Sequence, residues 1–208
     1  MLEIKQGTDA WHQARLGKVT ASKVADVMAK TKSGPSASRT NYMMELLCQR
    51  LTGAREEGYQ NAAMQRGTDL EPIARIAYEA AEGVLVDQVG FVIHPSIPEF
   101  GASPDGLVGN PGLIEIKCPN TAQHVDFLRT GRPDGKYIWQ MQAQIACAER
   151  DWCDFVSYDD RLPEALQYKR VRIMRDSAKI VEMETEIRAF LAELDALVIE
   201  LRGMANAP

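Results

Sequence analysis

The sequence lacks any apolar run long enough to cross a membrane. Nowhere do about 18 apolar residues follow one another, which excludes an ordinary membrane-spanning helix. The opening MLEIKQGTDAW carries charges where a secretory signal needs an apolar core. We therefore expect a soluble, cytoplasmic protein with no membrane partner.

Cysteine is scarce, and its spacing argues against several kinds of site. The four cysteines form no C-x-x-C pair, which disfavours zinc ligands, an iron–sulfur cluster and a disulfide framework. They lie in apolar segments that resemble helices and strands, so we expect them to be reduced, buried thiols. These residues are Cys48, Cys118, Cys147 and Cys153.

An excess of positive charge is also lacking. The net charge of −5 excludes a uniformly basic surface of the kind that coats nucleic acid. A local basic groove is still compatible with this charge, because basic residues gather near the start of the chain while acidic residues dominate its end. The early basic residues are Arg15, Lys18, Lys23, Lys30, Lys32 and Arg39.

What the sequence does contain is the composition of an ordinary globular protein. Hydrophobic residues make up 45% of the 208 residues and charged residues 25%, which excludes disordered and collagen-like classes. No composition break or internal repeat divides the chain. We predict a single domain over residues 1–208.

The residue patterns place helices at both ends of the chain and most strands in the middle. Apolar spacing with Ser/Thr and Gly end signals predicts helices over 20–30, 39–53, 61–83, 121–131 and 137–150, with Pro72 interrupting the third. Strands are predicted over 84–94, 113–117, 152–159 and 165–174. A long amphipathic helix follows over 180–201, and we expect it to pack on the protein's own core rather than on a partner. The order indicates an α/β fold, with a central mixed sheet flanked by helices and a long C-terminal helix.

Three charged residues lie close to a strand that is otherwise apolar. Side chains alternate between the faces of a strand, so Glu115 and Lys117 share one face, and Ile114 and Ile116 share the other. Asp105, in the turn SPDG, can fold back beside the charged face. Two adjacent carboxylates repel each other unless a cation lies between them, and Mg²⁺ takes such oxygen ligands. Each piece alone is typical of an ordinary strand or turn, but together they predict a metal site.

Pro104-Asp105 followed by Glu115-Ile116-Lys117 resembles the PD-(D/E)xK nuclease signature. Four blocks between Asp9 and Ala146 extend the likeness: DAWHQARLGKVTASKVADVMAKTKSG, RGTDLEPIARIAYE, SPDGLVGNPGLIEIKCPNT and YIWQMQAQIA. In order and spacing they resemble the lambda exonuclease family, also called YqaJ-like viral recombinases. The resemblance implies a restriction-endonuclease-like core and a Mg²⁺-dependent exonuclease. Such an enzyme degrades the 5′-ended strand of linear duplex DNA and leaves a 3′ overhang.

The resemblance also implies partners and a catalytic set. Family members form a ring-shaped homotrimer and work with a single-strand annealing protein in phage-type recombination. Two Mg²⁺ ions per site, with Mn²⁺ as a substitute, perform two-metal phosphodiester hydrolysis. The implied metal ligands are Asp105, Glu115 and the Ile116 carbonyl, with Glu71 near the second ion, Lys117 as the catalytic lysine and Gln140 as the active-site glutamine. Taken alone, Glu71 is also explained as a carboxylate near a helix start, and Gln140 as an exposed polar residue.

A second group of residues matches positions that bind DNA in the family. The implied 5′-phosphate residues are Arg15, Thr20 and Ser22; Lys32 and Ser103 are further substrate contacts, and Met64 is a wedge between strands. Without the resemblance, the same residues would be interpreted as a helix cap, a solvated run of charges and a methionine of the core. Gln123 stands where the family can carry an arginine that faces DNA. Two alternatives stay open: another PD-(D/E)xK nuclease of endonuclease or repair type, and a non-catalytic DNA-binding partner in recombination.

Overall fold

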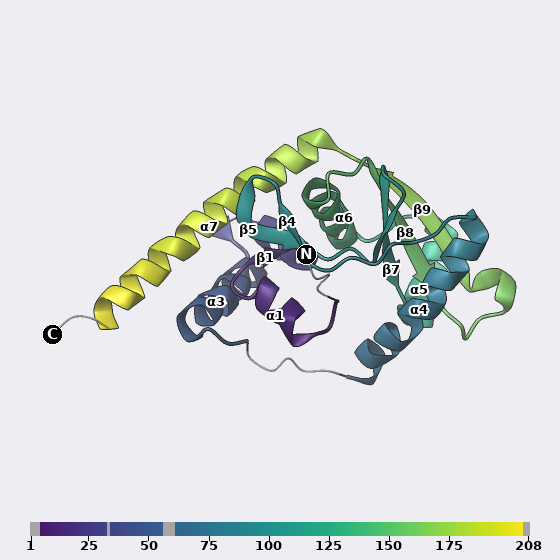
Figure 1. Ribbon diagram of the computed structural model, residues 1–208, viewed down its shortest axis with the longest axis horizontal. Helices are drawn as coiled ribbons and strands as arrows, with labels where there is room; N and C mark the ends of the chain where they lie inside the picture. Colours follow the sequence, from purple (N-terminus) through teal and green to yellow (C-terminus); the bar gives the residue numbers. More distant parts are fainter. Residues whose placement is uncertain (1–4, 33, 56–60, 206–208) are drawn as a thin grey trace.

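The larger sheet organises the fold. The computed structural model describes residues 5–32, 34–55 and 61–205, and Figure 1 shows helices on both sides of this sheet. Its strand order is β6-β7-β8-β9. The strands are β6 (Gly106–Val108), β7 (Gly112–Lys117), β8 (Trp152–Tyr158) and β9 (Tyr168–Met174). The sheet is mixed, because β7 runs parallel to β8 while the two outer pairs are antiparallel.

Two smaller sheets lie toward the N-terminal part of the chain. One has the order β1-β5-β4, with β1 parallel and β4 antiparallel to the central strand; the other is the antiparallel ribbon β2-β3. The strands are β1 (Val19–Thr20), β2 (Lys30–Thr31), β3 (Gly34–Pro35), β4 (Val92–His94) and β5 (Ile97–Ala102).

The helices begin and end at the residue types expected of caps. Side chains of Ser36, Asn61 and Asn120 accept backbone N–H bonds at three helix starts, and glycines with positive φ end the same helices. The helical elements are α1 (Asp9–Arg15), η1 (Ala21–Lys23), α2 (Val24–Met28), α3 (Ala37–Thr52), α4 (Ala62–Glu82), α5 (Thr121–Thr130), α6 (Gly135–Cys147), η2 (Glu164–Leu166) and α7 (Ser177–Ala205). No described helix combines the length and apolarity of a membrane span.

Opposite faces of the larger sheet pack on different helices. Leu70 and Tyr78 of α4 belong to one buried cluster with Ile114 and Ile116 of β7. On the other face, Phe155 of β8 belongs to a second cluster, together with residues of α5 and α6. The charged residues of β7 alternate with its isoleucines and therefore face the α6 side.

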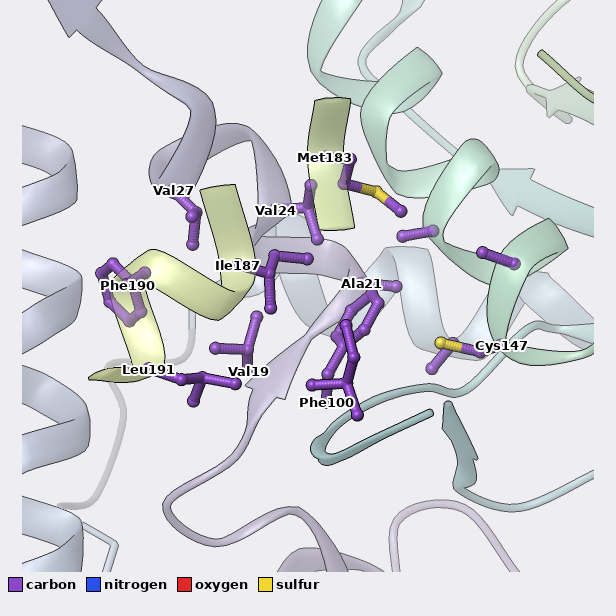
Figure 2. Packing of buried hydrophobic residues seen from close by; sticks show 14 of the residues in the cluster. Val19, Ala21, Val24, Val27, Phe100, Cys147, Met183, Ile187, Phe190 and Leu191 are labelled. Carbon is purple, nitrogen blue, oxygen red and sulfur yellow. The ribbon is translucent and has the colours of Figure 1, made fainter. Parts of the chain in front are cut away.

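The C-terminal helix packs on the protein's own core, as predicted. In Figure 2, Met183 and Ile187 of α7 gather with Val24 of α2, Val19 of β1 and Phe100 of β5. The buried stripe repeats every three or four residues and comprises Ile180, Met183, Ile187, Phe190, Leu191, Leu194 and Val198. α7 thereby packs against both the β1-β5-β4 sheet and the helices next to the larger sheet.

The prediction that Pro72 interrupts a helix was wrong. α4 continues through Pro72 without a break, because Leu70 and Tyr78 bury one side of the helix while Pro72 lies in solvent. The carbonyl left without its helical donor can then be satisfied by water. Pro98 lies inside β5, beside a register irregularity between β4 and β5, where a strand tolerates a missing N–H.

Other sequence predictions were partly wrong. The strand expected over 84–94 is reduced to β4 and an isolated bridge at Asp87, and the start of the one expected over 165–174 is the short helix η2. All four cysteines are free thiols, but only Cys147 and Cys153 are buried, whereas Cys48 is exposed. Cys48 lies on the outer side of α3, where an apolar helix context does not ensure burial.

Candidate active site

The charged face of β7 forms the centre of the site. Glu115 is only 1% exposed, and its Oε1 forms an ion pair with the Lys117 ammonium. This contact confirms that the two side chains share a face of the strand. A buried carboxylate needs such compensation, because losing water disfavours its charged form.

Two glutamines of α6 hold the Glu115 carboxylate in place. Gln140 Nε2 donates to Oε1 at 2.7 Å, and Gln144 Nε2 donates to Oε2 at 2.5 Å. The two residues are four positions apart, so they lie on one face of the helix. The sequence analysis missed Gln144. Its spacing from Gln140 was the available signal, but Gln142 between them is equally polar.

Asp105 folds back beside the end of β7, as the turn SPDG predicted. Its Oδ2 accepts a hydrogen bond from the backbone N–H of Ile116 at 2.6 Å, and its own N–H donates to the Ile114 carbonyl at 3.2 Å. Pairing with β6 ends at Gly106 and Ile114. Because the N–H and C=O of one strand residue point to the same edge, the Ile116 carbonyl faces the edge where Asp105 lies.

Burial and the neighbouring Glu115 charge both act on the Asp105 carboxyl group. Burial raises the pKa of Asp105 well above its usual value, and the nearby Glu115 charge raises it further, while Lys117 opposes both effects. Burial alone would lower the pKa of Lys117, but the Glu115 and Asp105 charges outweigh it and raise that pKa. The site therefore holds more negative charge than its single lysine neutralises.

Glu71 approaches the same centre from α4. Burial raises the pKa of its carboxyl group, Arg75 opposes that shift, and Glu115 adds to it. Arg75 forms an ion pair with Glu71 Oε1 at 2.6 Å. Glu71 lies in the interior of α4, so a helix start does not explain its position.

The donor set fits a hard divalent cation. The described residues contain no group of three or more His, Cys, Asp or Glu side chains placed to hold a metal. Two carboxylates and a backbone carbonyl at one edge are, however, the oxygen ligands that Mg²⁺ takes together with water. Asp105 and Glu115 also repel each other, and a cation between them would relieve that repulsion.

A separate cavity of about 500 Å³ lies between α1, η1, α3 and the start of α4, with Arg15, Thr20, Ser22 and Met64 in its wall. Arg15 packs over the Trp11 ring, 4.1 Å from its centroid. Burial lowers the pKa of Arg15 to about 10, so the guanidinium stays charged at neutral pH. Guanidinium and hydroxyl groups in one cavity are the donors that bind phosphate.

Ser103 connects this cavity to the carboxylates. Its Oγ lies 3.1 Å from Arg15 Nη1 and 2.9 Å from Trp11 Nε1, both of which donate to it. Asp105 follows only two residues later in the chain. The cavity and the carboxylate site are therefore neighbours, and Trp11 is a positioning residue that the sequence analysis missed.

The remaining predicted contacts lie in different places. Met64 is 55% exposed in the cavity wall, so its interpretation as a core residue was wrong. Lys32 is exposed between β2 and β3 and does not line the cavity. Gln123 is exposed on α5. The neighbouring His124 is buried and forms hydrogen bonds with Ser157 Oγ at 2.7 Å and with the Leu166 carbonyl at 2.8 Å, so it connects α5 to β8 and to η2, which precedes β9.

The chain is similar to a family of viral recombinases and to an exonuclease of known structure. Residues 10–151 match the model of the YqaJ-like viral recombinase domain. The chain is 60% identical to an alkaline exonuclease, LHK-Exo, from Laribacter hongkongensis, over 95% of this chain and 98% of that one, with TM-score 0.90. A crystal structure of LHK-Exo with dAMP matches at the same identity and coverage, with TM-score 0.91.

A more distant structure shares the fold alone. A phage-related exonuclease from Haemophilus somnus 129PT is 18% identical, over 88% of this chain and 96% of that one, with TM-score 0.70. No curated protein sequence matches the chain.

Proposed function

The chain belongs to the YqaJ-like viral recombinase family and is an alkaline-type exonuclease, and from this premise we propose that it degrades the 5′-ended strand of linear duplex DNA. The reaction is metal-dependent phosphodiester hydrolysis that leaves a 3′ single-stranded overhang. Residues 1–208 act as one exonuclease domain. One observation carries this proposal. The cavity at Arg15, whose donors suit a phosphate, is connected by Ser103 to the two neighbouring carboxylates Asp105 and Glu115.

The arrangement assigns a task to each group of residues. Arg15, Thr20 and Ser22 hold the 5′ phosphate, while Asp105, Glu115 and the Ile116 carbonyl hold Mg²⁺, with Glu71 toward a second ion. Bound at these residues, the ions would supply activation of a water and stabilisation of the leaving oxygen. Lys117 orients that water and offsets phosphate charge, because an ammonium is a compact point charge. Gln140 and Gln144 keep the Glu115 carboxylate in its binding orientation.

Further properties are proposed from the family resemblance. We infer two Mg²⁺ ions per site, with Mn²⁺ as a substitute, and a ring-shaped homotrimer that encloses DNA. An enclosed channel reconciles DNA tracking with a net charge of −5. Lys32 and Met64 act as DNA contacts, the latter as an exposed wedge. The product strand serves a single-strand annealing protein in phage-type recombination.

The proposed activity predicts a dependence on free ends. Purified protein with Mg²⁺ should release mononucleotides from linear duplex DNA and leave covalently closed circular duplex intact, because only the linear form presents a 5′ end to the Arg15 cavity. Gel analysis of both substrates, with strand-specific end labels, measures this. Cutting of closed circles would favour an endonuclease. Absence of cleavage on both substrates, with DNA binding retained, would favour a non-catalytic recombination partner.

The two glutamine bonds to Glu115 predict a selective effect on metal use. Gln144→Leu removes the donor to Glu115 Oε2, so only the contacts of Gln140 and Lys117 with Oε1 still orient the carboxylate. The Mg²⁺ concentration for half-maximal activity should rise about tenfold, as expected when a group that orients a metal ligand is lost. Initial rates measured across a Mg²⁺ titration give this midpoint.

Gln142 provides a matched control on the same helix. It is also buried, but its amide donates to the Met174 carbonyl and accepts from the Asp176 N–H, and neither bond involves Glu115. Gln142→Leu should lower the thermal midpoint of unfolding and leave the Mg²⁺ midpoint unchanged. Equal Mg²⁺ shifts in the two variants would mean that Gln144 acts only through folding stability.

A further inference from the structure

A second cavity opens directly beside Lys117, on the side of α5. It has a volume of about 450 Å³ and lies between α5, the start of α6 and the ends of β7 and β8. Phe127, Tyr137 and Phe155 form part of its wall. It shares no lining residue with the Arg15 cavity. Figure 1 shows α1 and α5 well apart, with the end of β7 between them.

Positive groups gather at this cavity. Lys117, Arg132 and Lys136 line it, and the Lys136 ammonium lies 4.9 Å from the centroid of the Tyr137 ring. Arg132 and Lys136 are exposed, and neither forms an ion pair with another residue that the structure describes. Lys117 itself pairs with Glu115. The charges of Arg132 and Lys136, in contrast, are available to an anion.

Two carboxylates also line the cavity, equal in number to the exposed cations Arg132 and Lys136. Asp134 accepts a hydrogen bond from the Lys136 backbone N–H at 3.0 Å and so caps α6. Asp126 lies on α5. Because Lys117 is already paired with Glu115, the two remaining cations balance the two carboxylates, so this cavity is less acidic than a chain whose net charge is −5.

The positions of the two cavities suggest a path for the DNA strand. A strand whose 5′ phosphate lies at Arg15 and whose first phosphodiester lies at Asp105 and Glu115 passes Lys117 when it is extended in the same direction. Arg132 and Lys136 line the same cavity as Lys117. This step rests on the proposed exonuclease function.

We propose that the cavity beside Lys117 is a DNA-backbone site. It binds phosphates of the degraded strand on the 3′ side of the scissile bond, with Arg132 and Lys136 as the contacts. Each cation that neutralises a phosphate releases counterions, so such contacts make DNA affinity depend on salt concentration. The cavity thereby holds the remaining strand after each nucleotide leaves.

The test is the salt dependence of duplex binding by the double variant Arg132→Ala/Lys136→Ala. Binding of a fluorescent linear duplex is measured by anisotropy in EDTA, so that no strand is cut, at several NaCl concentrations. The slope of log affinity against log salt should decrease in magnitude by about two, at about 0.9 per lost phosphate contact. The decrease should be the same for 5′-phosphate and 5′-hydroxyl ends, because the site lies beyond the first phosphodiester.

Arg129→Ala is the matched control, since Arg129 is an exposed cation of α5 that does not line the cavity. Its salt slope should equal that of the unmodified protein, and circular dichroism should show all variants folded. An unchanged slope in the double variant, from a protein that still degrades linear duplex, overturns this proposal alone. A protein that neither binds nor degrades linear duplex overturns the proposed function instead.

Discussion

Asp105→Asn should lower the rate of nucleotide release by at least about a thousandfold, the order of loss expected when one preorganised electrostatic group is removed. Asparagine keeps an oxygen that can accept the Ile116 N–H, so the turn should hold its shape. It loses the negative charge that a divalent cation requires. The Asp105 charge is also repelled by Glu115, so without metal the variant should unfold at a temperature no lower than that of the unmodified protein.

Two measurements separate catalysis from folding here. Initial rates give the loss of activity, and thermal denaturation with and without Mg²⁺ gives the stabilisation that binding provides. The unmodified protein should gain stability with Mg²⁺, and Asp105→Asn should lose most of that gain. Asp87→Asn, at an exposed aspartate in the isolated bridge to β6, should leave both quantities unchanged. A folded Asp105→Asn protein with activity within tenfold of the original would remove Asp105 from the metal site.

Asparagine at position 105 is a cleaner test than glutamine at position 115. The Glu115 carboxylate accepts from Gln140, Gln144 and Lys117 at once. A carboxamide offers one acceptor oxygen and adds two donors, so Glu115→Gln would leave buried donors facing each other. Loss of activity in that variant would therefore combine a chemical effect with a structural one.

The parts of the site that the sequence predicted depend on local geometry. Glu115 and Lys117 share a face because strand side chains alternate, and that pattern can be read from the letters alone. The mixed α/β fold and the long C-terminal helix are confirmed for a similar reason, since the stripe along α7 follows helical periodicity. Asp105 reached β7 because a proline and glycine turn brings the chain back over a short distance.

The parts that were missed depend on tertiary context. By its local chemistry, Pro72 should end a helix. The burial of Leu70 before it and Tyr78 after it in the sequence stabilises α4, which continues past the proline. The sequence does not show which glutamine of α6 contacts the active site. That depends on what each face of α6 packs against: Gln140 and Gln144 face Glu115, whereas Gln142 faces the residue before α7. Exposure of Met64 likewise depends on the open cavity at its side.

Arg15→Ala should remove most of a preference for 5′-phosphorylated ends. Ser103 and Trp11 hold the guanidinium at the cavity wall, and its charge is retained at neutral pH because its pKa falls only to about 10. A charge-assisted hydrogen-bonded pair with a terminal phosphate contributes about 1.5–3 kcal/mol, or about one to two decades in rate. The unmodified protein should therefore degrade a 5′-phosphate duplex faster than a 5′-hydroxyl duplex by that factor. The variant should degrade both at similar rates.

Comparing both substrates in both proteins forms a thermodynamic cycle, so general damage to folding or DNA affinity cancels. Lys18→Ala is the matched control, because Lys18 also lines the cavity but its ammonium is already paired with Glu99 at 3.1 Å. It should keep the preference of the unmodified protein. If Arg15→Ala slows both substrates by the same factor, Arg15 contacts the DNA backbone in general or supports the fold through Trp11, and the 5′ phosphate must be bound elsewhere.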